Sequence, residues 1–442
     1  MTTTLKIGVT GFSRSGKTVF IGSLAQALIT SEAWSARGQL GPLAQFEPYE
    51  RGYLKCASIR DDVHSDLPQF PFRQARDAMS GSQSQWPAAT DGISHLVLDL
   101  DYEVPSRFMT RRKTLRLDLV DYPGEWLADF PLLSLSYEEW SKQVLAQAQT
   151  GPRADMISQY REAIEALPWS ADEGDLEKIT SVWADYLSQA HSAGLVLNQP
   201  ARLLRPANLE NSPILRLVPL PADKLSYPVA GVLRKKYEQY IKRAVLPFYR
   251  DHFSKLDRQI VLVDVLRTLE LGSDAYDELM SGLRSVLQVF RYGNGSFFDR
   301  LRGHRTSHLL FAATKADHVT RGDRSNLRDM LRKIVRFVDD DNQLRRSVKH
   351  THSIALASVQ STEDRMTVQA PKREVLYGRP HGREEAAWDP GGIPLDIPPD
   401  WDELGFQFLE FQPQPMNDAL YDGFPAINLG RALNFLIGED IL

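Results

Sequence analysis

The chain has 442 residues, of which 42% are hydrophobic and 25% charged, which is enough for a sizeable core and for more than one domain. A formal net charge of −5 does not support nucleic-acid binding, and a single cysteine, Cys56, excludes internal disulfides. No apolar run reaches the ~18 residues of a membrane-spanning helix. The first expected strand begins so close to Met1 that we expect no signal peptide.

The first informative stretch lies near the N-terminus. Segment 4–9 has strand character, segment 19–28 is apolar at helical spacing, and Gly11 to Thr18 between them reads GFSRSGKT. This matches the phosphate-loop pattern, in which backbone N–H groups and a helix N-terminus bind phosphate oxygens. We expect Lys17 to contact the β- and γ-phosphates and the Thr18 hydroxyl to ligate Mg²⁺. The nucleotide-binding residues expected here are Ser13, Arg14, Ser15, Gly16, Lys17, Thr18 and Val19.

A long irregular stretch, 34–89, precedes strands that we expect at 96–104 and 114–120. The second of these strands ends in Asp121-Tyr122-Pro123-Gly124. Asp-x-x-Gly after an apolar strand is typical of Ras-type phosphate-loop nucleotidases. Asp121 would hold Mg²⁺ through water, and the Gly124 N–H would contact the γ-phosphate.

The next part of the chain has helical periodicity, which recurs in 137–148, 156–167, 176–190 and 232–253. Breaks that contain glycine or proline separate these segments. We interpret 130–256 as a helical insertion within the nucleotide domain. The sequence does not choose between a lid over the nucleotide and a separate docking module.

Buried strands are expected at 259–265 and 308–313, with a helix at 275–290 between them. The second strand ends in Thr314-Lys315-Ala316-Asp317. In the [NT]-K-x-D motif the carboxylate accepts hydrogen bonds from guanine N1–H and the exocyclic amine, while the lysine stem packs against the ring. Adenine lacks that donor pair and would leave the carboxylate unpaired. Threonine replaces the usual asparagine at the first position.

The C-terminal part is expected to complete this domain. A helix at 325–338, with Ser325 as its N-cap, precedes a strand at 353–358. The Ser358 and Val359 backbone would then touch the guanine base. The expected divisions are a first GTPase part (1–129), the helical insertion (130–256), a second GTPase part (257–362), a proline- and glycine-rich loop (363–412) and a closing part (413–442) with a helix at 425–437.

The ordered set GFSRSGKT, DYPG and TKAD, with helical and loop insertions, resembles the TRAFAC-type GTPases. More narrowly, the chain looks like the YcjX-like family of bacterial stress-associated proteins. The resemblance implies an α/β fold, namely a Ras-like P-loop GTPase sheet flanked by helices with an inserted α-helical domain. It also implies Mg²⁺, GTP/GDP binding, slow hydrolysis of GTP as a molecular switch, a cytoplasmic location and association with an inner-membrane partner.

Three residues decide the expected mechanism. Thr90 is the expected switch threonine and Mg²⁺ ligand, with Thr110 as the alternative. Glu125 occupies the place where Ras-type enzymes hold a water-orienting glutamine, and the alternative is an exposed turn glutamate. Arg14 is either an arginine finger supplied in cis or a solvent-facing or structural arginine.

Two other functions compete with the GTPase interpretation. One is an ATPase or small-molecule kinase, against which Lys315 and Asp317 argue. The other is a nucleotide-gated scaffold with negligible hydrolysis, in which the helical insertion binds a protein effector.

Overall fold

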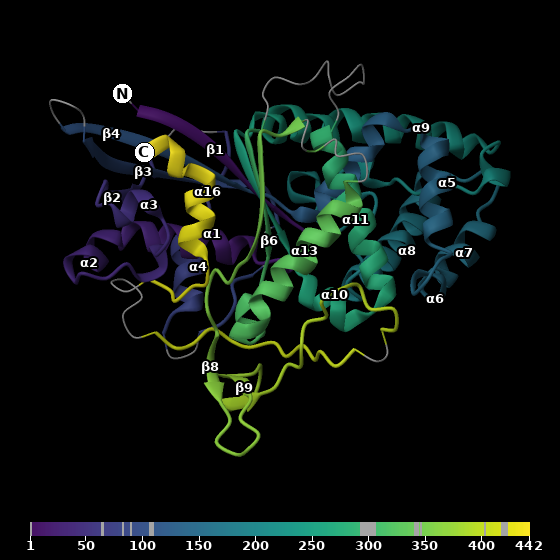
Figure 1. The fold of residues 1–442 in the computed structure, drawn as a ribbon. Helices are drawn as coiled ribbons and strands as arrows, with labels where there is room; N and C mark the ends of the chain where they lie inside the picture. Colours follow the sequence, from purple (N-terminus) through teal and green to yellow (C-terminus); the bar gives the residue numbers. More distant parts are fainter. Residues whose placement is uncertain are drawn as a thin grey trace. The chain divides into compact units, whose positions relative to one another are not determined.

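The structure is a computed structural model that describes residues 2–62, 66–81, 84–88, 91–105, 110–291, 306–339, 344, 347–401, 404–416 and 423–442. The chain divides into two compact units (Figure 1). The first unit comprises Met1–Tyr122, Leu256–Gly272 and Arg305–Leu442, and the second comprises Pro123–Lys255 and Ser273–His304. None of the helices in the described part of the chain combines the length and apolar character needed to span a bilayer.

A seven-stranded sheet organises the first unit, in the order β2-β3-β4-β1-β5-β6-β7. Its strands are β1 (Thr2–Gly11), β2 (Leu54–Ile59), β3 (Ser94–Pro105), β4 (Thr110–Asp121), β5 (Arg258–Val263), β6 (His308–Ala313) and β7 (His350–Ala355). Strands β4, β1, β5, β6 and β7 run parallel, whereas β2, β3 and β4 pair antiparallel. Every residue of β5 and β6 is buried, as their apolar runs predict.

Helices flank this sheet, which confirms the expected α/β fold class (Figure 1). The main helices of the first unit are α1 (Lys17–Ile29), α2 (Ser31–Ala36), α3 (Glu47–Glu50), α4 (Phe72–Met79), α10 (Val265–Leu271), α13 (Arg324–Val338) and α16 (Leu429–Ile441). Side chains of α1 and α16 join those of β1, β3 and β4 in one apolar core. Phe20, Leu24 and Leu433 in this core are at most 1% exposed. The core therefore holds the β1–α1 connection in place.

The second unit is helical. Its main helices are α5 (Tyr137–Gln147), α6 (Arg153–Met156), α7 (Ser158–Glu165), α8 (Glu173–Ser192), α9 (Pro228–Tyr240) and α11 (Ser273–Arg291), with π-helical turns at Ile241–Val245 and Phe248–His252. Capping boxes start α5 at Ser136 and α8 at Asp172. Trp140 and Trp183 are fully buried in its core.

Helix α11 lies in a different unit from the one that the sequence suggests. The sequence analysis assigned 257–362 to the GTPase domain, whereas the compact division places Ser273–His304 with the helical unit. One physical reason is a buried ion pair in which Arg153 of α6 donates to Glu278 of α11 over 2.6 Å. Since both side chains are at most 12% exposed, this pair holds α11 inside the second unit.

Local differences from the sequence expectations have local causes. The stretch 34–89 is not irregular throughout, because β2 and α4 form in it. The expected loop 363–412 contains a three-stranded antiparallel sheet, formed by β8 (Thr362–Met366), β9 (Glu374–Gly378) and β10 (Ala386–Trp388). Ser325 lies inside α13, which begins at Arg324, and is therefore not its N-cap.

Candidate functional site

The connection from β1 to α1 forms a tight turn. A Cβ on Gly11 would lie 2.6 Å from the Leu262 carbonyl oxygen of β5, so only glycine allows this approach. Gly16 precedes α1 with φ +88°, a conformation that favours glycine. The Lys17 amine donates to the carbonyl oxygens of Gly11 (2.7 Å) and Phe12 (3.2 Å). These bonds hold the Lys17 amine against the turn.

The remaining residues of the turn include a buried hydroxyl. Ser15 is 2% exposed, and its Oγ has no hydrogen-bond partner among the described residues. Arg14 is exposed and has φ +61°, which is uncommon for a residue other than glycine. Ser13 and Val19 are half-buried. A buried hydroxyl without a partner calls for one, and a phosphate oxygen at this turn would supply it.

Two of the three residues expected at Mg²⁺, Thr18 and Asp121, line one pocket of about 560 Å³. Asp121 ends β4, where it pairs with Val9 of β1, and it has no exposed surface. Thr18 lies in the first turn of α1. A hydroxyl and a carboxylate oxygen are the hard ligands that Mg²⁺ prefers, so these residues fit the ion.

The switch threonine is a separate matter. Thr90 lies outside the described residues. The alternative, Thr110, is the first residue of β4, and Asp121 is the last. Because the two residues lie at opposite ends of the same strand, Thr110 is not near the pocket that Thr18 and Asp121 line.

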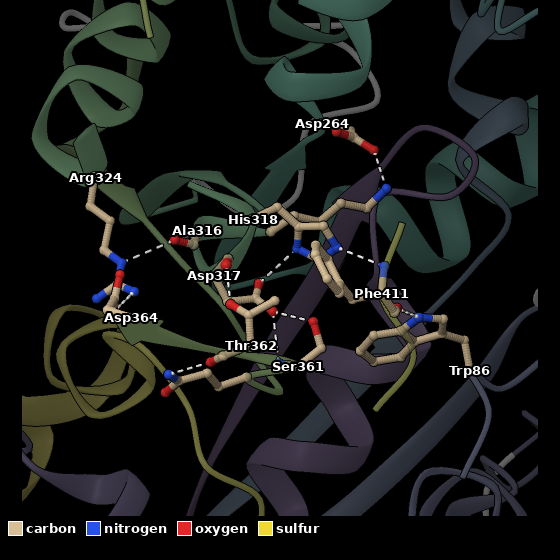
Figure 2. Close-up of polar contacts among 12 residues, drawn as sticks. Trp86, Asp264, Ala316, Asp317, His318, Arg324, Ser361, Thr362, Asp364 and Phe411 are labelled. Atoms are coloured by element: carbon tan, nitrogen blue, oxygen red, sulfur yellow. Dashed lines mark hydrogen bonds and ion pairs between the residues drawn. The ribbon is translucent and has the colours of Figure 1, made fainter. Parts of the chain in front are cut away.

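The polar side chains of the TKAD segment, which follows β6, are bonded to other residues of the protein (Figure 2). The Lys315 amine pairs with the carboxylate of Asp264, which follows β5, over 2.6 Å. Asp317 is 1% exposed, and its Oδ2 accepts hydrogen bonds from the N–H (2.8 Å) and the hydroxyl (2.5 Å) of Ser361. Its Oδ1 lies 3.1 Å from Nδ1 of His318. Thr314 donates its N–H to the Val263 carbonyl over 3.0 Å.

The environment of Asp317 keeps its carboxyl ionised. Burial by itself raises the pKa, but His318 and the hydrogen bonds from Ser361 outweigh burial and lower the pKa to about 2. A buried carboxylate needs such partners, and here the protein supplies them. In this arrangement the carboxylate that is expected to recognise guanine is hydrogen-bonded to Ser361 and His318.

Parallel pairing brings these groups to one edge of the sheet. Four groups lie at the carboxyl ends of the neighbouring parallel strands β1, β4, β5 and β6, namely the phosphate-loop turn, Asp121, Asp264 and the TKAD segment. Ligands of open α/β sheets bind at this edge.

Comparison with known proteins identifies the family of the chain. A sequence model described as "YcjX-like family, DUF463" matches residues 5–441. The chain belongs to the YcjX-like family. The Ras-like GTPase YcjX of Escherichia coli (strain K12) is 34% identical over 459 residues, which cover 99% of this chain and 96% of that protein. The Ras-like GTPase YcjX of Shewanella oneidensis is 32% identical over 472 residues, covering 99% and 94%.

In this YcjX-like chain, Gly124 and Glu125 belong to the second unit, where they begin a 3₁₀ segment, Gly124–Ser134. Glu125 is 6% exposed, so it is not an exposed turn glutamate. Its Oε1 accepts a hydrogen bond from Nε of Arg205 over 3.3 Å and lies 3.8 Å from Nε2 of His191. The carboxylate therefore has partners within the helical unit.

Sequence reasoning missed several partners of the TKAD segment. It named Ser358 and Val359 for contact with the base, and it did not name Ser361, which lies beyond the end of β7 at Ala355 and binds Asp317. Val359 instead packs with Met79 and Phe424 in a small apolar cluster. The presence of a second serine shortly after Ser358 was the only sequence feature that could have pointed to Ser361 as a partner of Asp317. Nothing in the local pattern pointed to Asp264.

Proposed function

We propose that this chain binds GTP with Mg²⁺ and hydrolyses it to GDP and phosphate, and that it acts as a molecular switch. One observation carries the proposal: Thr18 and Asp121, which the motifs assign to Mg²⁺, line the same pocket beside a complete phosphate loop. The printed names of the two relatives, both called Ras-like GTPases, support it. A cytoplasmic location, a role in stress and an inner-membrane protein partner belong to the proposal through the family resemblance.

The proposed chemistry follows from the residues of the turn. The Lys17 amine would turn from its carbonyl partners toward the β- and γ-phosphates, and the Ser15 hydroxyl would donate to a phosphate oxygen. Thr18 would ligate Mg²⁺ directly and Asp121 through water. The bound ion would neutralise charge on the β- and γ-phosphates. A water oxygen attacks the γ-phosphorus, the bond to the β–γ bridging oxygen breaks, and GDP is the leaving group.

The residues proposed to act on the reacting groups are Arg14, Thr90 and Glu125. The exposed Arg14 side chain would swing over the bridging oxygen as an arginine finger in cis. Gly124 would donate its N–H to the γ-phosphate, and Thr90 would close over Mg²⁺. For Glu125 to orient the attacking water, its hydrogen bond with Arg205 has to open.

Competition binding with a fluorescent GDP analogue tests the nucleotide. GTP and GDP should displace the probe at concentrations at least tenfold lower than ATP, because only guanine offers the donor pair for Asp317. Lys17→Ala should lose binding, whereas Lys113→Ala, which changes an exposed lysine of β4, should retain it. Equal competition by ATP would favour the ATPase or kinase alternative.

Phosphate release tests the reaction. With Mg²⁺ present, the wild-type protein should release phosphate from GTP over hours, and EDTA or Lys17→Ala should abolish this release. If GTP binds but no phosphate appears above the Lys17→Ala background, the protein is a nucleotide-gated scaffold rather than a GTPase.

A further inference from the structure

A segment from the C-terminal part of the chain, residues 404–412, contacts the TKAD segment; we call it the cover segment. Its Phe408 ring stacks on His318, with centroids 5.4 Å apart and an interplanar angle of 12°. The Lys315 amine lies 4.9 Å from the centroid of the same ring. The Phe411 N–H donates to Nε2 of His318 over 3.4 Å, so the other nitrogen of the imidazole carries the proton that His318 donates to Asp317.

Further hydrogen bonds hold the cover segment beside the pocket of Thr18 and Asp121. Trp86, which lines that pocket, donates its indole N–H to the Phe411 carbonyl over 2.8 Å (Figure 2). Gln412 donates its N–H to the Arg379 carbonyl over 2.9 Å, just after β9. The segment is thus anchored at both the base-recognition side and the Mg²⁺ side of the sheet edge.

The contacts leave no room for a base between the Lys315 amine and the Phe408 ring. A planar ring held between two groups needs about 7 Å, twice the ~3.5 Å contact distance between carbon atoms. The 4.9 Å between the Lys315 amine and the Phe408 centroid is smaller than that. The second guanine contact, Asp317, is 1% exposed. Phe408 therefore covers the Lys315 amine, and Ser361 and His318 occupy the carboxylate oxygens of Asp317.

We propose that the cover segment is an intramolecular plug of the guanine site, in which Phe408 takes the face of Lys315 that the base would occupy. This inference rests on the proposed function of the same site. Guanine nucleotide and Phe408 then compete, and the protein binds nucleotide only in the fraction of molecules whose cover segment has moved away. The strength of nucleotide binding is set by how firmly the cover segment is held.

The test is a matched pair of variants. Phe408→Ala should bind fluorescent GDP about 3- to 30-fold more tightly than wild type, since it removes one ring stack and one cation–π contact that favour the covered state. Phe337→Ala, which removes a 58% exposed phenylalanine of α13, should leave affinity unchanged. Unchanged affinity in Phe408→Ala overturns the plug. Weaker binding also overturns it, because Phe408 would then be a wall of the base site.

A second measurement uses the wild-type protein, so it does not depend on how the variant folds. Amide hydrogen exchange in residues 404–412 should become faster when GDP saturates the protein, and unchanged or slower exchange overturns the plug. A different result would refute the proposed function. If neither wild type nor Phe408→Ala prefers guanine over adenine nucleotides, the protein has no guanine site, and the plug proposal is refuted as well. Tight, guanine-specific binding to wild type that Phe408→Ala does not improve removes the plug alone.

Discussion

The ion pair between Arg153 and Glu278 should be one of the main stabilising contacts of the helical unit. Glu278 Oε1 accepts from Arg153 Nε over 2.6 Å, and its Oε2 accepts from the N–H groups of Val196 (3.2 Å) and Leu197 (3.1 Å). The Arg153 side chain is 3% exposed. Glu278→Ala would leave this guanidinium buried without a carboxylate, and removing one partner of a buried pair costs about 3–5 kcal/mol.

Urea unfolding followed by circular dichroism measures this loss. Because the chain has two compact units, the transition of the helical unit should move to lower urea while the other changes less. The control is Asp251→Ala, which removes the partner of exposed Arg250 and should cost less than about 1 kcal/mol. A Glu278→Ala loss as small as that of the control would refute the reasoning.

A double variant separates the charge from the packing. Replacing both Arg153 and Glu278 by leucine leaves no unpaired charge in the interior, so it should be more stable than Glu278→Leu alone. If the double variant is the less stable of the two, the loss came from packing and not from a buried unpaired cation.

Three other predictions follow from single residues. Burial raises the pKa of Asp129 to about 7 from an ordinary 3.8, so the folded state binds the proton more tightly than the unfolded state. The free energy of unfolding should therefore fall as pH rises from about 4 to 7. Urea titrations of Asp129→Asn should show a weaker dependence of this free energy on pH, and an unchanged dependence would contradict the prediction. Gly11→Ala forces a Cβ to within 2.6 Å of the Leu262 carbonyl oxygen, which should cost about 1–3 kcal/mol of stability and weaken GDP binding; calorimetry that finds neither change would show that the turn can move. Arg14→Ala should slow GTP turnover by about 10³-fold with little change in affinity, and wild-type turnover would end the arginine-finger proposal.

The phosphate loop was predictable because everything that it needs is local. Gly11 and Gly16 set the backbone, and Lys17 and Thr18 follow within two residues, so a short pattern is enough to specify the turn. The strand that ends in Asp121 was recognisable in the same way, from its apolar run and the polar residue after it. The order of these pieces along the chain also indicated the α/β fold class.

Contacts between residues far apart in the chain could not be predicted in this way. The amphipathic pattern of α11 marks it as a helix, but its tertiary contacts, among them the buried pairing of Glu278 with Arg153, assign it to the helical unit. Likewise, TKAD reads as a guanine motif in the sequence, whereas the partners of Asp317 and Lys315, Ser361 and Phe408, come from later segments. Local residue patterns determine backbone conformation and the type of chemistry, but which groups finally meet depends on how distant segments pack against one another.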